Sequence, residues 1–230
     1  MSEVDRLREE VCAANRALVT HGLVTLTWGN VSGITADRRL VAIKPSGVPY
    51  GELTPQDIVV VDMQGRVAAG LLRPSTDTPT HWELYRAFPA VGGVVHTHSL
   101  YATMFAQARR PVPCLGTTHA DHFAGAVPVT RQLKPEEMGD YERATGRVIA
   151  ERLGEADAAN VPAALVAGHG PFAWGPTVAK ALENAVALEA VARMALGTLL
   201  VNAEAAGLEA HVLAKHHGRK HGAGKYYGQG

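Results

Sequence analysis

The sequence predicts one α/β domain in which helices cover both faces of a central sheet. Apolar runs of strand length alternate with helical patterns along the 230 residues, and no linker or shift in composition divides them. Apolar residues make up 47% of the chain and charged residues 19%, as in ordinary soluble globular proteins. We therefore expect a single domain over residues 1–230.

The first helix is indicated by apolar residues at spacings of three and four. These residues are Val4, Leu7, Val11, Ala14 and Leu18. Apolar runs at 40–43 and 58–61 predict two strands, with glycine and proline turns between them. Segment 27–32 is expected to be a turn. Thr78 is the expected N-cap of a short helix that has Pro79 at its first position.

The second half of the chain continues the alternation. A strand is expected over 91–98, a helix from Pro135, a short strand over 165–167, and a long helix from Pro176 to about Gly207. One face of the helix from Pro135 would carry Met138, Tyr141, Thr145, Val148 and Ile149.

The tail from about residue 211 is basic, rich in glycine and close to two tyrosines. One interpretation is a frayed terminus. The other is a mobile flap that brings a phenol and a cation over an active site, where nearby positive charge lowers the phenol pKa.

Charge and cysteine content exclude several classes of protein. Lys plus Arg and Asp plus Glu number 22 each, so no net field attracts nucleic acid or an anionic membrane. Cys12 and Cys114 do not form a disulfide framework, which fits a reducing cytoplasm. The charged start of the chain does not resemble a signal peptide, and charges interrupt the apolar segment 178–201. We expect a cytoplasmic protein without nucleic-acid or membrane partners.

Two histidines separated by one residue point to a metal site. His96 and His98 follow an apolar run, and side chains two apart on a strand face the same way. Converging imidazoles suit a transition metal, zinc above all. Asp77 and His169 lie beside glycine or proline turns and are candidate further ligands. The alternative is that all four are ordinary polar residues at loop ends.

Three polar loops are suited to a phosphate or a sugar. They are segments 27–32, 44–47 and 74–76, in which glycine exposes backbone N–H groups, serine and threonine donate hydroxyls, and Lys44 supplies a charge. Segment 116–122 carries proton-transfer groups and has three possible interpretations. It could be an ordinary polar loop, or a second metal site formed by His119 and His122. We prefer the third interpretation, in which Asp121 is a general acid or base. A metal beside a phosphate site suits enolate chemistry.

Long motifs of the chain closely resemble the L-ribulose-5-phosphate 4-epimerases, a branch of the class II (zinc) sugar-phosphate aldolase and epimerase family. The matching segments are Leu23–Ser32, Ile43–Val48, Ser75–His81, Gly93–Ser99, Gly116–Asp121, His169–Gly175 and Tyr226–Gln229. The resemblance runs from the first helix to the tail. It implies a three-layer α/β/α sandwich around a mixed, largely antiparallel sheet, in a homotetramer with active sites between subunits.

The resemblance also implies roles for individual residues. Asp77, His96, His98 and His169 would hold Zn²⁺, with Mn²⁺ or another divalent transition metal as alternatives. Asp121 and Tyr227 would be the acid/base pair, with Tyr227 supplied by the adjacent subunit. The substrate, mostly its phosphate, would contact Gly29, Asn30, Lys44, Ser46, Gly47, Ser75 and Thr76, with Thr117, Glu142 and His216 at supporting positions. These epimerases usually carry serine where this chain has Thr76, which keeps the hydroxyl.

The implied activity interconverts L-ribulose 5-phosphate and D-xylulose 5-phosphate, a step of arabinose catabolism. The bond between carbons 3 and 4 breaks to give an enediolate of dihydroxyacetone and glycolaldehyde phosphate, and re-forms on the other face of the aldehyde. One alternative is a sugar-phosphate aldolase of the L-fuculose 1-phosphate type. These aldolases tend to carry glutamate, as both ligand and base, where this chain has Asp77. Another is a non-catalytic assembly domain like the head of adducin.

Overall fold

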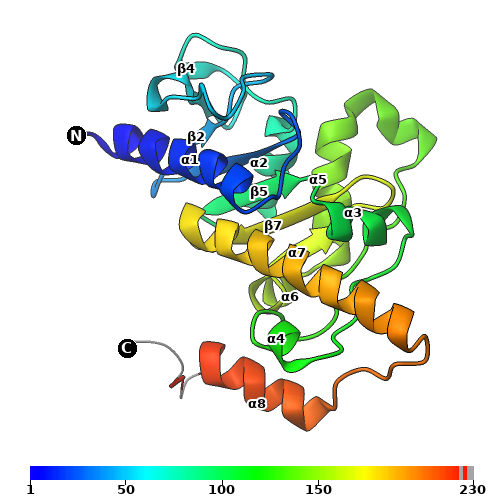
Figure 1. Cartoon of the computed structure of the whole chain (residues 1–230). Coiled ribbons are helices and arrows are strands. Elements are labelled where there is room, and N and C mark those ends of the chain that lie inside the picture. The colour runs from blue at the N-terminus through cyan, green and yellow to red at the C-terminus, as the bar shows by residue number, and fades with distance from the viewer. Residues whose placement is uncertain (223–224, 227–230) are drawn as a thin grey trace.

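The computed structural model describes residues 1–222 and 225–226, and their strands form one sheet with helices on both faces (Figure 1). The strands are β1 (Gly29–Ile34), β2 (Leu40–Ile43), β3 (Val59–Asp62), β4 (Val67–Ala69), β5 (Gly93–Thr97), β6 (Ala163–Leu165) and β7 (Pro171–Gly175). The α-helices are α1 (Glu3–Thr20), α2 (Thr78–Ala87), α3 (Leu100–Gln107), α4 (Thr117–Ala120), α5 (Tyr141–Arg152), α6 (Glu155–Asn160), α7 (Val178–Val201) and α8 (Ala210–His221). Two 3-10 helices are η1 (Pro55–Asp57) and η2 (Pro135–Asp140).

The seven strands of the described residues are ordered β4-β3-β2-β1-β5-β7-β6. Every ladder between neighbouring strands is antiparallel. One isolated parallel bridge joins Val129 to Leu165 outside these ladders. The expected α/β/α sandwich with a largely antiparallel sheet is confirmed. The central pair is β1 and β5, in which Asn30 lies opposite His96.

The two faces of the sheet belong to two separate cores. Successive strand residues alternate between them, so that Val95 packs into the core under α1, α3 and α7, whereas Val94 packs into the core under α2 and α5. In Figure 1, α1 and α7 cross in front of the strands, and α2 and α5 lie behind them. His96 is two residues from Val94 and its ring stacks on Phe172 of the second core, which places this imidazole on the same face.

Buried polar groups fix the helices next to the central strands. Asn15 of α1 pairs with Val31 of β1: its Nδ2 donates to the Val31 carbonyl at 3.1 Å, and the Val31 N–H donates to its Oδ1 at 2.9 Å. Glu189 of α7 accepts from the N–H groups of Tyr101 and Ala102 at 2.8 and 3.0 Å. These carboxylate contacts satisfy N–H groups in the first turn of α3 that have no partner within the helix, directly after β5.

The largest error of the sequence analysis concerns β1, which was expected to be a turn at 27–32. The glycines of β1 do not form a turn but allow other elements to pack closely on the strand. A Cβ on Gly33 would lie 2.6 Å from Val178 and 2.7 Å from Leu7, so α1 and α7 rest directly on the strand backbone. Strand β7 was also not expected, because a proline begins it and a glycine ends it. The strand expected at 165–167 instead occupies Ala163–Leu165.

Several helix boundaries also differ from expectation. Thr78 is the first residue of α2, and Asp77 is its N-cap. The helix expected from Pro135 begins as the 3-10 helix η2, in which Met138 is 49% exposed and does not belong to a buried face. Helix α7 ends at Val201 rather than near Gly207, and α8 follows.

Within the described residues, α7 is the one helix long and apolar enough to cross a membrane, contrary to the sequence expectation. Core helices of soluble proteins meet the same criterion of length and composition. In this protein, 39% of its most apolar stretch is buried, and the helix packs against β5, β7 and α3.

Candidate metal centre

Three imidazoles converge at one end of the central strands. Candidate ligand atoms of His96, His98 and His169 all lie within 4.8 Å of one another. The ring centroids are 5.0 Å apart for His96 and His98, 4.8 Å for His96 and His169, and 5.0 Å for His98 and His169. His96 is on β5, His98 directly follows it, and His169 lies in the turn before β7. Pairing of β5 with β7 therefore brings distant parts of the chain together.

Hydrogen bonds orient two of the rings. Nδ1 of His96 lies 3.0 Å from the Pro171 carbonyl, to which it donates, and this leaves a lone pair on Nε2. That Nε2 lies 3.2 Å from Nε2 of His98. Nδ1 of His169 lies 3.2 Å from the Tyr141 hydroxyl. Such partners on the far nitrogen are the usual support of metal-binding imidazoles.

The same imidazoles are held in the neutral form that metals require. Burial lowers the pKa of His96 and of His98, and burial together with the two other imidazoles lowers the pKa of His169 to about 4. Neutral nitrogens that face one another across 3.2 Å need either a shared proton or a cation between them. A divalent transition metal fits this donor set.

Two glycines allow the imidazoles to approach. A Cβ on Gly170 would lie 2.8 Å from the Thr97 carbonyl oxygen and 3.4 Å from the His98 ring. Gly29 has a φ of +116°, and a Cβ there would lie 2.8 Å from the His96 carbonyl oxygen. Side chains at these two positions would displace the backbone that carries the imidazoles.

Asp77 lines the same cavity but is not part of the compact group of three. It does not cap α2 with its side chain. Its Oδ2 instead accepts from Nδ2 of Asn30 at 2.7 Å. Burial raises the pKa of Asp77, but the nearby imidazoles of His96 and His81 and the Asn30 amide outweigh burial and lower it. The carboxylate is thus kept ionised beside the three histidines.

The cavity at the imidazoles has a volume of about 430 Å³ and opens beside the loops at 44–47 and 74–76. Twelve sequence-predicted site residues line it. They are Gly29, Asn30, Lys44, Ser46, Gly47, Ser75, Thr76, Asp77, His96, His98, Glu142 and His169. The two loops are joined by backbone hydrogen bonds, from Ser46 N–H to the Arg73 carbonyl at 2.9 Å and from Ser75 N–H to the Lys44 carbonyl at 3.0 Å.

Lys44 is a buried cation in this cavity. It is 2% exposed, and its Nζ contacts the Pro45 carbonyl at 3.2 Å and lies 4.8 Å from the centre of the Tyr50 ring. Within the described part of the chain no carboxylate forms an ion pair with it. Burial lowers its pKa to about 8. Such a group favours an anionic ligand.

The structure does not bring Asp121 into the cavity of the imidazoles. Asp121 is the C-cap residue that follows α4, and its carboxylate contacts side chains of α8. Arg219 donates to its two carboxylate oxygens at 3.0 and 2.6 Å, and Nδ1 of His216 lies 3.1 Å from Oδ1. Burial raises the pKa of Asp121, but these contacts outweigh burial and lower it. Thr117 is exposed at the start of α4, and Tyr227 lies outside the described residues.

The alternative of a second metal site through His119 and His122 gains no support from the described residues. Nε2 of His119 contacts the Gly125 carbonyl at 2.7 Å, and the two histidines do not belong to a ligand cluster.

Sequence reasoning assigned no role to three side chains of this region. Tyr141 lines the cavity and contacts His169. The Trp28 ring is half exposed and its centroid lies 6.4 Å from that of His98. His81 is fully buried, with Nδ1 2.7 Å from Oγ of Ser32 and without a partner on Nε2. Trp28 and His81 fall inside matched motifs, whereas Tyr141 had only a helical face as a signal.

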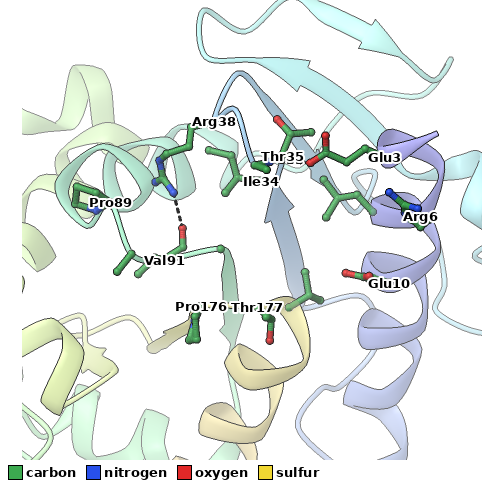
Figure 2. Close-up of a pocket in the computed structure, with 15 residues that line it drawn as sticks. Glu3, Arg6, Glu10, Ile34, Thr35, Arg38, Pro89, Val91, Pro176 and Thr177 are labelled. Carbon is green, nitrogen blue, oxygen red and sulfur yellow. Dashed lines mark hydrogen bonds between the residues drawn. The ribbon is translucent and has the colours of Figure 1, made fainter.

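A second cavity, of about 420 Å³, lies between the N-terminal ends of α1 and α7 (Figure 2). Glu3, Arg6 and Glu10 border it, and Arg38 donates a hydrogen bond to the Val91 carbonyl at 3.0 Å across one side. None of the residues that line it belongs to the imidazole group, the one metal-ligand cluster found in the described residues. The cavity at the imidazoles is therefore the candidate site.

Comparison with known proteins agrees with this geometry. The chain matches the model of the family "Class II Aldolase and Adducin N-terminal domain" over residues 9–196. The structure of YgbL from Klebsiella pneumoniae, described as a putative aldolase/epimerase/decarboxylase, is 30% identical. The match covers 94% of this chain and 99% of that chain, with a TM-score of 0.74.

Two solved L-fuculose 1-phosphate aldolases share the fold. One is 24% identical, with coverage of 93% of this chain and 95% of that chain and a TM-score of 0.78. The other, from Thermus thermophilus, is also 24% identical, with coverage of 87% and 98% and a TM-score of 0.69.

Proposed function

The chain belongs to the class II aldolase and adducin N-terminal domain family, and on that basis we propose that it is a metal-dependent 4-epimerase of pentulose 5-phosphates. The proposed reaction interconverts L-ribulose 5-phosphate and D-xylulose 5-phosphate by breaking and re-forming the bond between carbons 3 and 4. One observation carries the proposal: three neutral imidazoles and a buried lysine share one cavity. The imidazoles are suited to bind an electrophilic metal, and the lysine is suited to bind a phosphate.

In this proposal His96, His98, His169 and Asp77 hold a divalent transition metal, with Zn²⁺ or Mn²⁺ as candidates. Three imidazoles and a carboxylate form a donor set that is closed on one side by the protein and open to the cavity on the other. The bound ion would polarise the substrate ketone and stabilise the negative charge of the enediolate. The Asn30 amide, 2.7 Å from Asp77, orients that carboxylate.

The phosphate of the substrate is proposed to bind at the other end of the cavity. Lys44 supplies the positive charge, and the hydroxyls of Ser46, Ser75 and Thr76 supply hydrogen-bond donors. Gly47 has a φ of +71°, and no atom lies within 4 Å of the position of a Cβ there, which leaves room for an anion against the backbone.

Epimerisation rather than aldol cleavage is favoured by the residue at position 77. Asp77 is short and its oxygen is engaged by Asn30, so it is poorly placed to move protons. Proton transfer is then left to Asp121 on one face of the aldehyde and Tyr227 on the other, as the sequence motifs imply. Because Asp121 lies outside the cavity of its own chain, we propose that it acts at a neighbouring subunit of a homotetramer.

The second candidate is a sugar-phosphate aldolase that releases its aldehyde. The observation in its favour is the shared fold with two L-fuculose 1-phosphate aldolases. A non-catalytic role like that of an adducin head is not favoured, because such a domain has no use for converging imidazoles and a buried lysine.

The decisive experiment incubates the purified protein with L-ribulose 5-phosphate, with and without Zn²⁺ or Mn²⁺, and identifies the products. We expect D-xylulose 5-phosphate, loss of turnover with a chelator, and no accumulation of two fragments. His98→Ala should lower kcat/KM by at least about 10²-fold, and the exposed His21→Ala is the matched control. Cleavage of L-fuculose 1-phosphate into two fragments would support the aldolase instead. Full activity of His98→Ala would refute the metal-dependent mechanism.

A further inference from the structure

We propose that Tyr141 is a positioning residue of the metal centre, whose hydroxyl holds His169 in the ring orientation that directs Nε2 to the ion. This inference rests on the proposed metal-dependent function. Tyr141 is the first residue of α5, and its hydroxyl oxygen lies 3.2 Å from Nδ1 of His169. The two rings are tilted by 35° with their centroids 6.1 Å apart, so the contact is made through the hydroxyl and not by stacking.

The chemistry of imidazole makes this contact significant. A neutral imidazole offers a metal one nitrogen and carries its proton on the other. When Nδ1–H of His169 donates to the tyrosine oxygen, the lone pair is left on Nε2. His96 has the same arrangement: its Nδ1–H donates to the Pro171 carbonyl at 3.0 Å, and the lone pair is left on Nε2. Among the residues that the structure describes, two of the three imidazoles are thus supported through Nδ1, and Tyr141 is the one side chain that does so.

The position of Tyr141 is itself fixed by close packing of α5 on α2. The Thr80 hydroxyl of α2 donates to the Glu142 carbonyl at 2.7 Å, and the Thr145 hydroxyl donates to the Tyr141 carbonyl at 2.9 Å. A Cβ on Gly146 would lie 2.8 Å from the Thr80 carbonyl oxygen, so the backbones of the two helices lie in close contact at this point. Because α2 begins directly after Asp77, one helix pair positions both the carboxylate and the support of His169.

The test is the affinity of the apoprotein for Zn²⁺, measured by competition with a chromophoric chelator. Tyr141→Phe removes only the hydroxyl, and we expect the dissociation constant to rise by about 10- to 100-fold. The Co²⁺-loaded variant should show shifted d–d absorption bands because the geometry of His169 changes. Tyr101→Phe is the matched control, since Tyr101 is on α3 and lines a different cavity. Its affinity for Zn²⁺ should equal that of the unmodified chain.

A double-mutant comparison separates positioning from general structural damage. In the His169→Ala background, Tyr141→Phe should change the Zn²⁺ affinity by less than about threefold, since the residue it supports is gone. The same large factor in both backgrounds would overturn the inference. Equal affinities and spectra of Tyr141→Phe and the unmodified chain would also overturn it, and would leave the proposed function intact. Failure of the unmodified chain to bind Zn²⁺ would overturn both.

Discussion

At the scale of single residues, the candidate centre depends on glycines as much as on the metal-binding side chains. The Thr97 carbonyl and the His98 ring occupy the space next to Gly170 that a methyl group would need. The imidazoles reach one another because the turn before β7 passes directly beneath them. Glycine is required at such a contact because no larger residue fits, and not because the chain must be flexible there.

Gly170→Ala should therefore weaken the site and the fold together. A Cβ 2.8 Å from the Thr97 carbonyl oxygen forces the backbone to shift, and we expect a loss of about 1–3 kcal/mol in the free energy of unfolding. Urea denaturation of the apoprotein measures this loss, and chelator competition should show weaker Zn²⁺ binding. Gly139→Ala is the control, since no atom lies within 4 Å of a Cβ there. Unchanged stability and affinity of Gly170→Ala would contradict the packing argument.

Lys44 predicts a specific pH dependence of anion binding. Burial lowers its pKa to about 8, so the side chain is charged below that pH and neutral above it. Affinity for an anion should be retained below pH 8 and fall by up to about tenfold for each further pH unit. Sulfate is the probe, because its own charge is constant over this range, and titration calorimetry from about pH 6 to 10 measures its binding.

The control for this prediction is Lys44→Met. Its affinity for sulfate should be low at every pH and should have no inflection near pH 8. An inflection that persists in Lys44→Met would assign the titration to another group.

The sequence alone predicted part of this site for a clear physical reason. His96 and His98 are two residues apart, and the geometry of an extended chain is local. The approach of His169 depends on the pairing of β5 with β7, which no spacing reveals. Its glycine and proline turn made His169 a candidate ligand, and the family resemblance then implied its place at the metal. The contact of Tyr141 with His169 depends on the packing of α5 on α2, so neither the pattern nor the matched motifs indicated it.

At the scale of elements, the packing of α2 on α5 decides how the carboxylate and the tyrosine meet the imidazoles. Salt bridges reinforce it at the surface, because Glu83 of α2 contacts Arg143 of α5 at 3.1 Å. The close approach itself comes from Gly146, which lies against Thr80 and Glu83. Glycine costs helix stability, and this helix retains it where a side chain would separate the pair.

Gly146→Ala and Gly197→Ala should change stability in opposite directions. Both glycines lie inside helices, but a Cβ on Gly146 would meet Cβ of Glu83 at 2.5 Å, whereas that on Gly197 meets no atom within 4 Å. We expect Gly146→Ala to cost about 1–3 kcal/mol through overpacking. Gly197→Ala should gain about 0.5–1 kcal/mol through helix propensity. Urea denaturation measures both, and equal signs would show that packing does not decide the outcome.

The failure of the sequence analysis to predict β1 has a related cause. β1 contains Gly29 and Gly33, which are typical of turns in an isolated segment. In the fold they allow helices and neighbouring strands to lie close to the central strand. The need for glycine therefore comes from tertiary contacts, which the local sequence does not show. Segments such as 40–43 needed no such contact to be recognised, because their β-branched residues are typical of strands by themselves.

At the scale of the whole molecule, the proposed catalytic groups fall into two separate places. The imidazoles, Asp77 and Lys44 share the cavity at the end of the central strands. Asp121 lies with His216 and Arg219 where α8 packs on α4, at the lower edge of the view in Figure 1. If both places serve one reaction, the second must come from another copy of the chain. This arrangement requires an oligomer, and the family resemblance implies a homotetramer, so we expect a particle of four 24.3 kDa chains in light-scattering measurements.

Mixed oligomers test this arrangement directly. His98→Ala removes a proposed metal ligand, and Asp121→Asn removes a proposed acid/base group without altering the lining of the cavity. Each variant alone should have little epimerase activity, although Asp121→Asn should bind Zn²⁺ as tightly as the unmodified chain. If the two variants are co-expressed in equal amounts and mix at random, about one quarter of the sites combine an intact metal set with an intact Asp121. Activity should therefore recover to about that fraction. Recovery requires that the two groups act from different subunits, because no single chain in the mixture carries both. Mixed oligomers that remain as inactive as the separate variants would place Asp121 outside the catalytic machinery of the neighbouring subunit.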